Sequence, residues 1–333
     1  MKNFPFFVIV FVELATVSFL VGKIYLEQSQ VLGENISINP ISKEDVIFPN
    51  QDSDSHLKNF YEPMPNTDIT NKPDWLPSDY SYTITTNADS LNERFNYSLE
   101  KDPHVFRIVT MGSSYTFGIN VNTRENYPER LEDMLNENLE CKTIKKFEVI
   151  NLGVAGYDIE YAVHRFKVRG QKYNPDLLLW FISSDNDFSL INELIGHKLD
   201  QYRKEMKSYQ AVLDEFQRRG IFTPWNIKAK LEFMPEIGEE GVLVYNKKAL
   251  WRMRDYYKGR LVFITFSGDI TLNGSYLSVL QGFAKERGDT YIYDGLSSNY
   301  DRFPDKHPTS KGYEKIADGI FHYITRNHLI PCD

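Results

Sequence analysis

The chain has 333 residues, of which 41% are hydrophobic and 25% charged, and its formal net charge at pH 7 is −8. This apolar content suits one large folded domain or two small ones and excludes a chain that is disordered throughout. The negative charge, without a basic cluster, argues against nucleic acid as a partner, and two cysteines exclude a cysteine-rich metal site.

The amino terminus carries an apolar run over residues 4–21, with Lys2 before it and Lys23 after it. About 18 apolar residues suffice to span a bilayer. Glu13 costs roughly 2–3 kcal/mol in the middle of the run, which the surrounding apolar side chains offset. No cleavage signal ends the run, so residues 1–25 are predicted to be a retained transmembrane anchor. A cleaved signal peptide and a buried helix are the alternatives, and the first two would export the rest of the chain.

Residues 26–84 are predicted to be a low-order tether or linker. They are rich in Asn, Asp, Ser and Pro, and no helical or strand period persists in them. Within this stretch Trp75, Tyr80 and Tyr82 are candidates for docking the chain onto the domain that follows. That domain is expected to occupy residues 85–333.

From about residue 100, candidate strands alternate with helical patterns. The strands are expected at residues 106–111, 147–152, 177–182, 261–266 and 290–293. The helices are expected at residues 127–139, 159–168, 276–287 and 310–327. The middle three strands are nearly continuous apolar runs, as in strands buried on both faces. The alternation predicts βαβ units and a parallel sheet, whose functional loops lie at the carboxyl ends of the strands.

Residues 189–258 interrupt this alternation. They contain long charged helical stretches and several aromatic residues. We expect a helical insertion that packs over the strand ends as a lid or a substrate wall. A solvated helical excursion is the alternative.

Two glycine-bearing segments follow the first two strands. Residues 112–118 read Gly-Ser-Ser-Tyr-Thr-Phe-Gly and predict a strand-to-helix turn that holds a serine rigid and exposed. Such a serine can be a nucleophile if a base reaches its hydroxyl and N–H groups face the developing oxyanion. Residues 151–157 read Asn-Leu-Gly-Val-Ala-Gly-Tyr and can present a further N–H. Each segment alone is also typical of an ordinary turn.

Two polar segments complete the set. Residues 183–187 read Ser-Ser-Asp-Asn-Asp and can supply an asparagine amide to the same oxyanion. Residues 305–308 read Asp-Lys-His-Pro, where the histidine can reach a nucleophile while a carboxylate fixes its tautomer. No metal-ligand spacing, nucleotide-binding motif or Gly-x-Ser-x-Gly elbow occurs, so neither a metal nor a cofactor is expected.

In this order and at these strand ends, the four segments resemble the SGNH (GDSL-like) hydrolase family over about residues 85–327. The resemblance implies a three-layer, flavodoxin-like α/β fold with about five parallel strands and helices on both faces. Residues 86–94 also look like the lead-in of many exported bacterial members.

The resemblance assigns roles to five residues. It implies that Ser114 is the nucleophile, His307 the base and Asp305 the acid that orients the base. It selects Gly156, rather than the earlier glycine of its segment, and Asn186 as oxyanion donors. Each of these assignments matches the family's order of motifs.

The chain departs from the family pattern at three places. Ser113 stands where the family has an aspartate, and Ser184 stands where it has a glycine. The family spaces its acid and base as Asp-x-x-His, whereas Asp305 stands one residue closer to the histidine. A relocated acid, at Asp305 or at Asp301, and a Ser–His dyad supported by a backbone carbonyl are the possibilities.

The resemblance implies a serine ester hydrolase that acts on an acyl or acetyl ester outside the cytoplasm through an acyl-enzyme. A polysaccharide O-acyltransferase with the same site and a catalytically inactive binding module are the alternatives. The expected partners are an acylated small molecule or polysaccharide and a membrane, which the N-terminal segment would contact. A single disulfide between Cys141 and Cys332 is possible, and the sequence alone does not decide whether it forms.

Overall fold

The computed structural model describes residues 46–47, 57, 60–73, 75–194 and 225–332. The predicted anchor or signal peptide, residues 1–25, lies outside these residues. Within the described part of the chain, no helix combines the length and apolar character needed to cross a membrane. No cluster of His, Cys, Asp or Glu among those residues could hold a metal ion.

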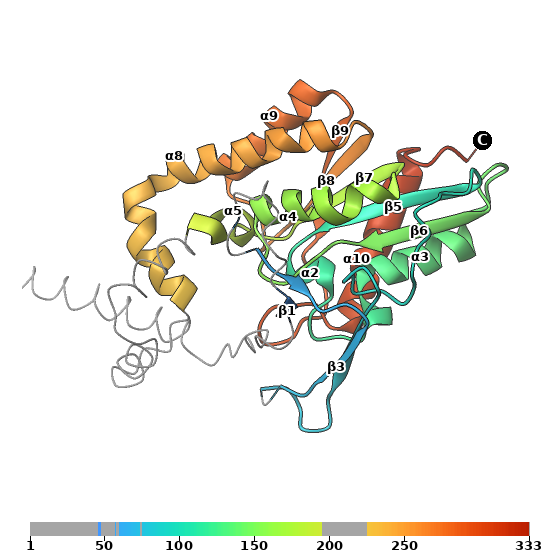
Figure 1. Ribbon diagram of the computed structural model, residues 1–333, viewed down its shortest axis with the longest axis horizontal. Coiled ribbons are helices and arrows are strands. Elements are labelled where there is room, and N and C mark those ends of the chain that lie inside the picture. Colours follow the sequence, from blue (N-terminus) through green and yellow to red (C-terminus); the bar gives the residue numbers. More distant parts are fainter. Residues whose placement is uncertain (1–45, 48–56, 58–59, 74, 195–224, 333) are drawn as a thin grey trace, which may run out of the picture. The chain divides into compact units, whose positions relative to one another are not determined.

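A sheet of five parallel strands forms the centre of the domain, in the order β6–β5–β7–β8–β9 (Figure 1). The strands are β5 (Val105–Gly112), β6 (Lys146–Asn151), β7 (Leu177–Ile182), β8 (Arg260–Ser267) and β9 (Thr290–Ser297). All five predicted strands are present, and β9 extends further than predicted. The first strand lies between the second and the third, which is the flavodoxin-like order.

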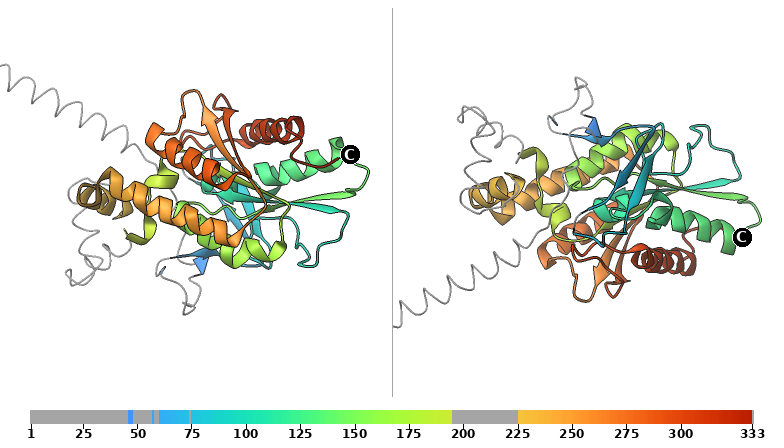
Figure 2. Two further views of the ribbon diagram at one scale, coloured as in Figure 1. Left: turned by 90° about the horizontal axis from the view of Figure 1, so that it is seen from above. Right: turned by 90° about the horizontal axis from the view of Figure 1, so that it is seen from below.

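Helices cover both faces of this sheet (Figure 2). One face packs against α3 (Tyr127–Asn138) and α10 (Ser310–Arg326). The other face packs against α4 (Ile159–Arg165), α8 (Trp225–Tyr256) and α9 (Gly274–Arg287). Neighbouring residues of one strand serve opposite faces, as Ile108 and Val109 do in β5. The predicted three-layer α/β fold is therefore confirmed.

The helices begin at polar residues that cap them. The side chains of Asn126, Asp158, Asn273 and Thr309 accept hydrogen bonds from backbone N–H groups in the first turns of α3, α4, α9 and α10. Such caps satisfy donors that have no partner inside the helix. The remaining helical turns are α2 (Ser114–Phe117), η1 (Thr123–Glu125), η2 (Phe166–Gly170), η3 (Gln171–Tyr173) and α5 (Asn186–Ser189).

The second half of the predicted insertion, residues 189–258, is the crossover helix between β7 and β8. Helix α8 bends at Gly238, and beyond the bend it buries Val242, Leu250 and Met253 in the core beside the sheet. Parallel neighbours need such a crossover, so this half belongs to the three-layer fold itself. Residues 195–224 of the predicted lid or wall lie outside the described residues.

The prediction of a low-order tether is wrong for residues 60–84. Strand β2 (Glu62–Pro63) pairs with β1 (Val46–Ile47), and β3 (Thr67–Asn71) forms an antiparallel hairpin with β4 (Tyr82–Thr86). The free edge of β4 donates to side chains of the loop before α3, with Thr83 N–H bound to Asn122 Oδ1 and Thr85 N–H to Thr123 Oγ1. These partners lie far along the chain, so local sequence periodicity does not reveal the hairpin.

A buried ion pair anchors the start of this segment to α4. Glu62 and Arg165 are each 1% exposed and are joined by a salt bridge, and Arg169 adds a second one at 2.8 Å. Burial on its own raises the pKa of Glu62, but the two guanidinium groups hold it below its usual value. The carboxylate is therefore ionised at neutral pH.

We predict that Glu62→Gln lowers the free energy of unfolding by about 3 kcal/mol at pH 7, because it leaves Arg165 buried without a counter-charge. The folded-state pKa is depressed, so the Glu62 contribution is complete above the unfolded value of about 4.3 and is lost as the pH falls through the folded value. Urea unfolding at pH 7 and in the acid range tests this. Glu137→Gln, at an exposed site on α3, is the matched control. The prediction is contradicted if Glu62→Gln and the wild type have the same free energy of unfolding at pH 7, or if the difference between them is as large in acid as at pH 7.

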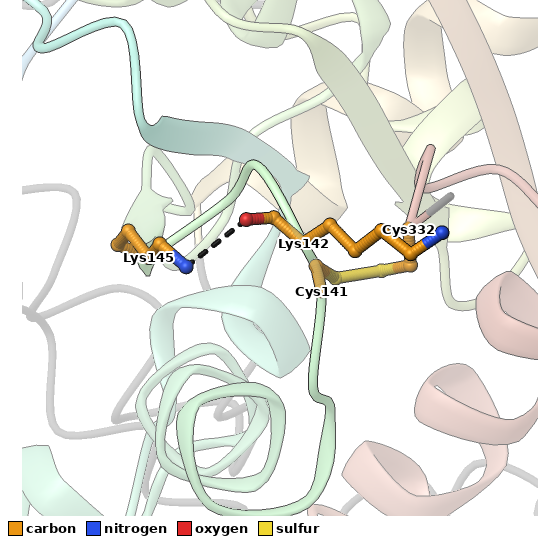
Figure 3. Close-up of a disulfide and its surroundings, with 4 residues drawn as sticks. All are labelled: Cys141, Lys142, Lys145 and Cys332. Carbon is orange, nitrogen blue, oxygen red and sulfur yellow. Dashed lines mark hydrogen bonds between the residues drawn. A yellow bond between two sulfur atoms is a disulfide. The ribbon is translucent and has the colours of Figure 1, made fainter.

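Cys141 and Cys332, whose pairing the sequence does not decide, form a disulfide (Figure 3). The bridge joins the loop after α3 to the segment after α10 across 191 residues of sequence. A cross-link over so long a loop restricts the unfolded chain.

The double variant Cys141→Ala/Cys332→Ala should be less stable than the wild type by about 2–4 kcal/mol. Thermal unfolding with and without a thiol reductant measures this effect. The reductant should lower the wild-type midpoint and leave that of the double variant where it is. Equal midpoints for all four samples would show that the bridge does not stabilise the fold.

Candidate active site

Ser114, His307 and Asp305 form one chain of hydrogen bonds. Ser114 Oγ lies 2.8 Å from His307 Nε2, and His307 Nδ1 lies 2.9 Å from Asp305 Oδ2. The backbone N–H of His307 also donates to Asp305 Oδ1 at 3.1 Å. A ring whose Nδ1–H faces the carboxylate presents its Nε2 lone pair to the serine hydroxyl, which is the arrangement of a general base.

The serine lies where the sheet changes direction. Ser114 is the first residue of α2, directly after β5, and β5 has β6 on one side and β7 on the other. Ligands of open α/β sheets bind at such switch points. Gly112 makes the turn possible with φ +153°, because a side chain there would lie 2.8 Å from the carbonyl oxygen of Phe181.

The short spacing between acid and base depends on the residue between them. Lys306 has φ +71°, a left-handed conformation that brings the carboxylate of Asp305 to both the ring and the backbone of His307. Tyr115 Oη donates to the Lys306 carbonyl at 2.9 Å and so holds this turn. The hydrogen bonds of the His307 ring thus go to Ser114 and Asp305, and not to the alternative acid, Asp301.

Asp305 remains charged despite its burial. Burial raises the pKa of this carboxyl, but hydrogen bonds from His307 and Asn120, together with the charge that His307 can carry, hold it below its usual value. Asn120 Nδ2 lies 2.7 Å from Asp305 Oδ2. An ionised carboxylate in this place stabilises the imidazolium that forms when a histidine takes a proton.

Three donors at the ends of neighbouring strands have no hydrogen-bond partner within the described part of the chain. They are the backbone N–H groups of Ser114 and Gly156 and the side-chain amide of Asn186, which follow β5, β6 and β7. Gly156 and Asn186 are exposed to solvent, and Gly156 has φ +80°. Donors without a partner are the groups that a developing oxyanion can accept from.

A buried carboxylate closes the loop after β7, and the hydroxyls of Ser113 and Ser183, 3.4 Å apart, join this loop to the one after β5. Asp187 Oδ2 accepts from the backbone N–H of Ser183 at 2.6 Å and from that of Ser184 at 3.2 Å. Burial raises the pKa of Asp187 to about 6, against hydrogen bonds from Ser113 and Ser183 that lower it. Ser113 therefore gives Asp187 a hydroxyl donor, where an aspartate would place a second carboxylate.

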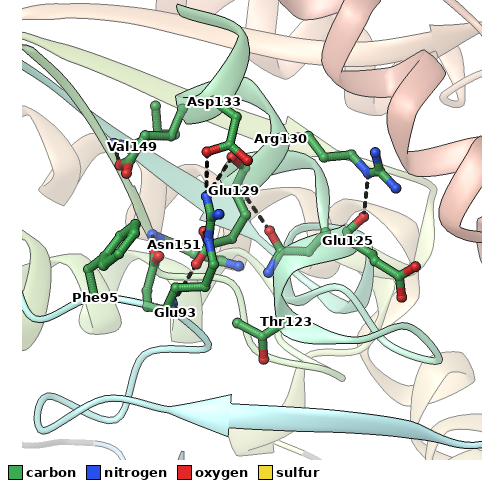
Figure 4. Close-up of polar contacts among 12 residues, drawn as sticks. Glu93, Phe95, Thr123, Glu125, Glu129, Arg130, Asp133, Val149 and Asn151 are labelled. Carbon is green, nitrogen blue, oxygen red and sulfur yellow. Dashed lines mark hydrogen bonds and ion pairs between the residues drawn. The ribbon is translucent and has the colours of Figure 1, made fainter. Parts of the chain in front are cut away.

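The lead-in segment contributes contacts that the sequence did not reveal. Asn92 Nδ2 donates to the Phe117 carbonyl at 2.6 Å. Glu93 accepts from the N–H of Asn151 at the end of β6 (Figure 4), so this segment contacts both α2 and the start of the second functional loop. Burial and the neighbouring Glu129 raise the pKa of Glu93 well above its usual value. Residues 86–94 resemble a lead-in motif of the family, but that resemblance assigns no role to Asn92 or Glu93, and only the tertiary contacts identify what they hold.

No family model matches the chain, and no curated protein matches it. Among solved structures, a psychrotrophic esterase from Pseudoalteromonas sp. is similar at 10% identity and a TM-score of 0.42, over 67% of this chain and 98% of that one. A lipase/acylhydrolase from Enterococcus faecalis is similar at 15% identity and a TM-score of 0.41, over 67% and 96%. An acetyl xylan esterase from the rumen bacterium Butyrivibrio proteoclasticus is similar at 10% identity and a TM-score of 0.41, over 68% and 65%. The function proposed below rests on the chain's own geometry.

We predict that Gly153→Ala destabilises the domain by about 1–3 kcal/mol, because the new methyl group would collide with the backbone of Thr116 and Phe117 in α2. Gly282→Ala is the matched control, since a methyl group there meets nothing and favours helix α9. The urea midpoint of unfolding should fall for Gly153→Ala and rise for Gly282→Ala. A Gly153→Ala protein as stable as the wild type would contradict the close packing of these two loops.

Proposed function

We propose that this chain is a serine ester hydrolase of the SGNH (GDSL-like) type that cleaves an acyl or acetyl ester through an acyl-enzyme. The observation that carries the proposal is the chain of hydrogen bonds from Ser114 through His307 to Asp305. The free donors of Ser114, Gly156 and Asn186 supply the second requirement of acyl transfer.

The first half of the reaction forms the acyl-enzyme. Ser114 Oγ attacks the ester carbonyl carbon while His307 Nε2 takes the hydroxyl proton, and Asp305 stabilises the imidazolium. The carbonyl oxygen becomes an oxyanion that accepts from the N–H groups of Ser114 and Gly156 and from the Asn186 amide. The tetrahedral intermediate then expels the alcohol, which leaves with the proton held by His307.

The second half releases the acid. Water gives a proton to His307 Nε2 and attacks the acyl carbon, and the same three donors hold the second oxyanion. Collapse of this intermediate breaks the bond to Ser114 Oγ, which recovers its proton from His307. Polysaccharide O-acyl transfer is the alternative, in which a sugar hydroxyl takes the place of this water at the same acyl-enzyme.

The proposal includes action outside the cytoplasm, on an acylated small molecule or polysaccharide, by a membrane-anchored or secreted protein. Two features support this location: the apolar run at residues 4–21 and the disulfide between Cys141 and Cys332. Disulfides persist in oxidising compartments and are rare in the cytosol. The intact hydrogen-bond chain argues against the alternative of a catalytically inactive binding module.

A fluorophosphonate probe and a p-nitrophenyl acyl ester test the proposed function. The probe should label one residue, Ser114, and Ser114→Ala should lose the label and lower kcat/KM by about 10³-fold or more. Ser113→Ala is the matched control and should still be labelled, because Ser113 faces Asp187 rather than His307. Wild-type turnover by Ser114→Ala, or labelling at Ser113, would contradict the proposal.

A further inference from the structure

The carboxylate of Asp305 is held by a residue that lies shortly after the nucleophile. Asn120 Nδ2 donates at 2.7 Å to Oδ2, the oxygen that also accepts from His307 Nδ1. Asn120 is 2% exposed. Because a carboxylate can only accept, the amide must turn its nitrogen toward Asp305, which fixes the orientation of the side chain.

Asn120 is itself held by the hairpin that precedes the domain. Tyr82 Oη donates to Asn120 Oδ1 at 3.3 Å, and Tyr80 Oη donates to the Asn120 carbonyl at 2.6 Å. Burial raises the pKa of Tyr82 to about 12, so this hydroxyl is protonated and can donate. Asn120 has φ +68°, a conformation that asparagine and glycine adopt more readily than other residues.

The position of the Asp305–His307 pair relative to Ser114 depends on contacts from outside the pair. Asp305 and His307 are bonded to each other within one turn, so they can move together without breaking their own hydrogen bonds. Tyr115 ties the backbone of this turn to the segment that carries Ser114. The bond from Asn120 ties the carboxylate itself to the same segment.

We propose that Asn120 is a positioning residue for the Asp305–His307 pair, and that the hairpin β3–β4 holds it in place through Tyr80 and Tyr82. This inference rests on the proposed function. It assigns the segment before residue 85 a part in aligning the base with the nucleophile.

Three substitutions separate positioning from folding. Asn120→Gly removes the amide and keeps the left-handed backbone free of strain. Asn120→Asp keeps the shape and places a second carboxylate against Asp305. Tyr82→Phe removes the hydroxyl that holds the amide. Asn136→Ala is the matched control, because the side chain of Asn136 bonds to Glu132 and to the backbone of Phe147 in β6, away from the hairpin and from Asp305.

Asn120→Gly should lower kcat by about tenfold and leave KM within about twofold, because the base is misaligned while ester binding is intact. Tyr82→Phe should lower kcat by a smaller factor. Asn120→Asp should move the acid limb of kcat/KM to higher pH, because the added negative charge favours the protonated imidazole, which cannot act as a base. Asn136→Ala should lower the melting temperature, because it loses two hydrogen bonds to Phe147, and should leave both kcat and the pH profile near those of the wild type.

A wild-type kcat and pH profile in both Asn120 variants would overturn the inference, and so would an Asn136→Ala protein that reproduces their kinetic changes. The proton NMR resonance of the His307 Nδ1–H gives a readout that needs no turnover. This resonance should shift in Asn120→Gly and stay in place in Asn136→Ala. If the resonance shifts in this way among the variants but the wild type hydrolyses no ester, the positioning role is supported and the proposed function is refuted.

Discussion

The 2.8 Å contact between Ser114 Oγ and His307 Nε2 joins two loops that are 193 residues apart in sequence. A misplacement of about 1 Å between reacting groups can cost a factor of about 100 in rate. The contact therefore requires both loops to be fixed by something more rigid than themselves. The five-stranded sheet supplies that rigidity, because helices bury both faces of its strands other than the edge strand β9.

The loops are held further by polar groups buried between them. The hydroxyls of Ser113 and Ser183, 3.4 Å apart, join the loops after β5 and β7. Asp187 closes the loop after β7 on itself, and Glu93 accepts from Asn151 at the end of β6. Leaving a buried polar group without its partner costs about 1–3 kcal/mol, so each such bond resists displacement of a loop. Asn120 likewise donates a hydrogen bond to Asp305, the acid of the site, and so resists displacement of its carboxylate.

The elements of the sheet could be predicted because their signals are local. Strand β7 is a continuous apolar run, and α10 follows a threonine cap with one apolar face. The positions of Ser114 and His307 could be inferred because motif order and spacing are properties of the sequence itself. The structure then brings these two residues into contact.

The features that the sequence did not reveal depend on distant partners. The hairpin β3–β4 cannot be predicted from local sequence, because contacts that stabilise it come from Asn122 and Thr123, far along the chain. The acid spacing was ambiguous because the left-handed conformation of Lys306 is set by the fold around it. Asn120 belongs to no motif, and its contact with Asp305 spans 185 residues.

The central claim is that Ser114, Gly156 and Asn186 surround one oxyanion position beside a base. A crystal structure of the phosphonylated protein tests it most directly, because the adduct places an oxygen where the oxyanion would form. The claim predicts phosphorus on Ser114 Oγ and that oxygen at about 3 Å from the N–H groups of Ser114 and Gly156 and from Asn186 Nδ2. An adduct on another residue, or an oxygen that contacts none of these donors, would contradict it.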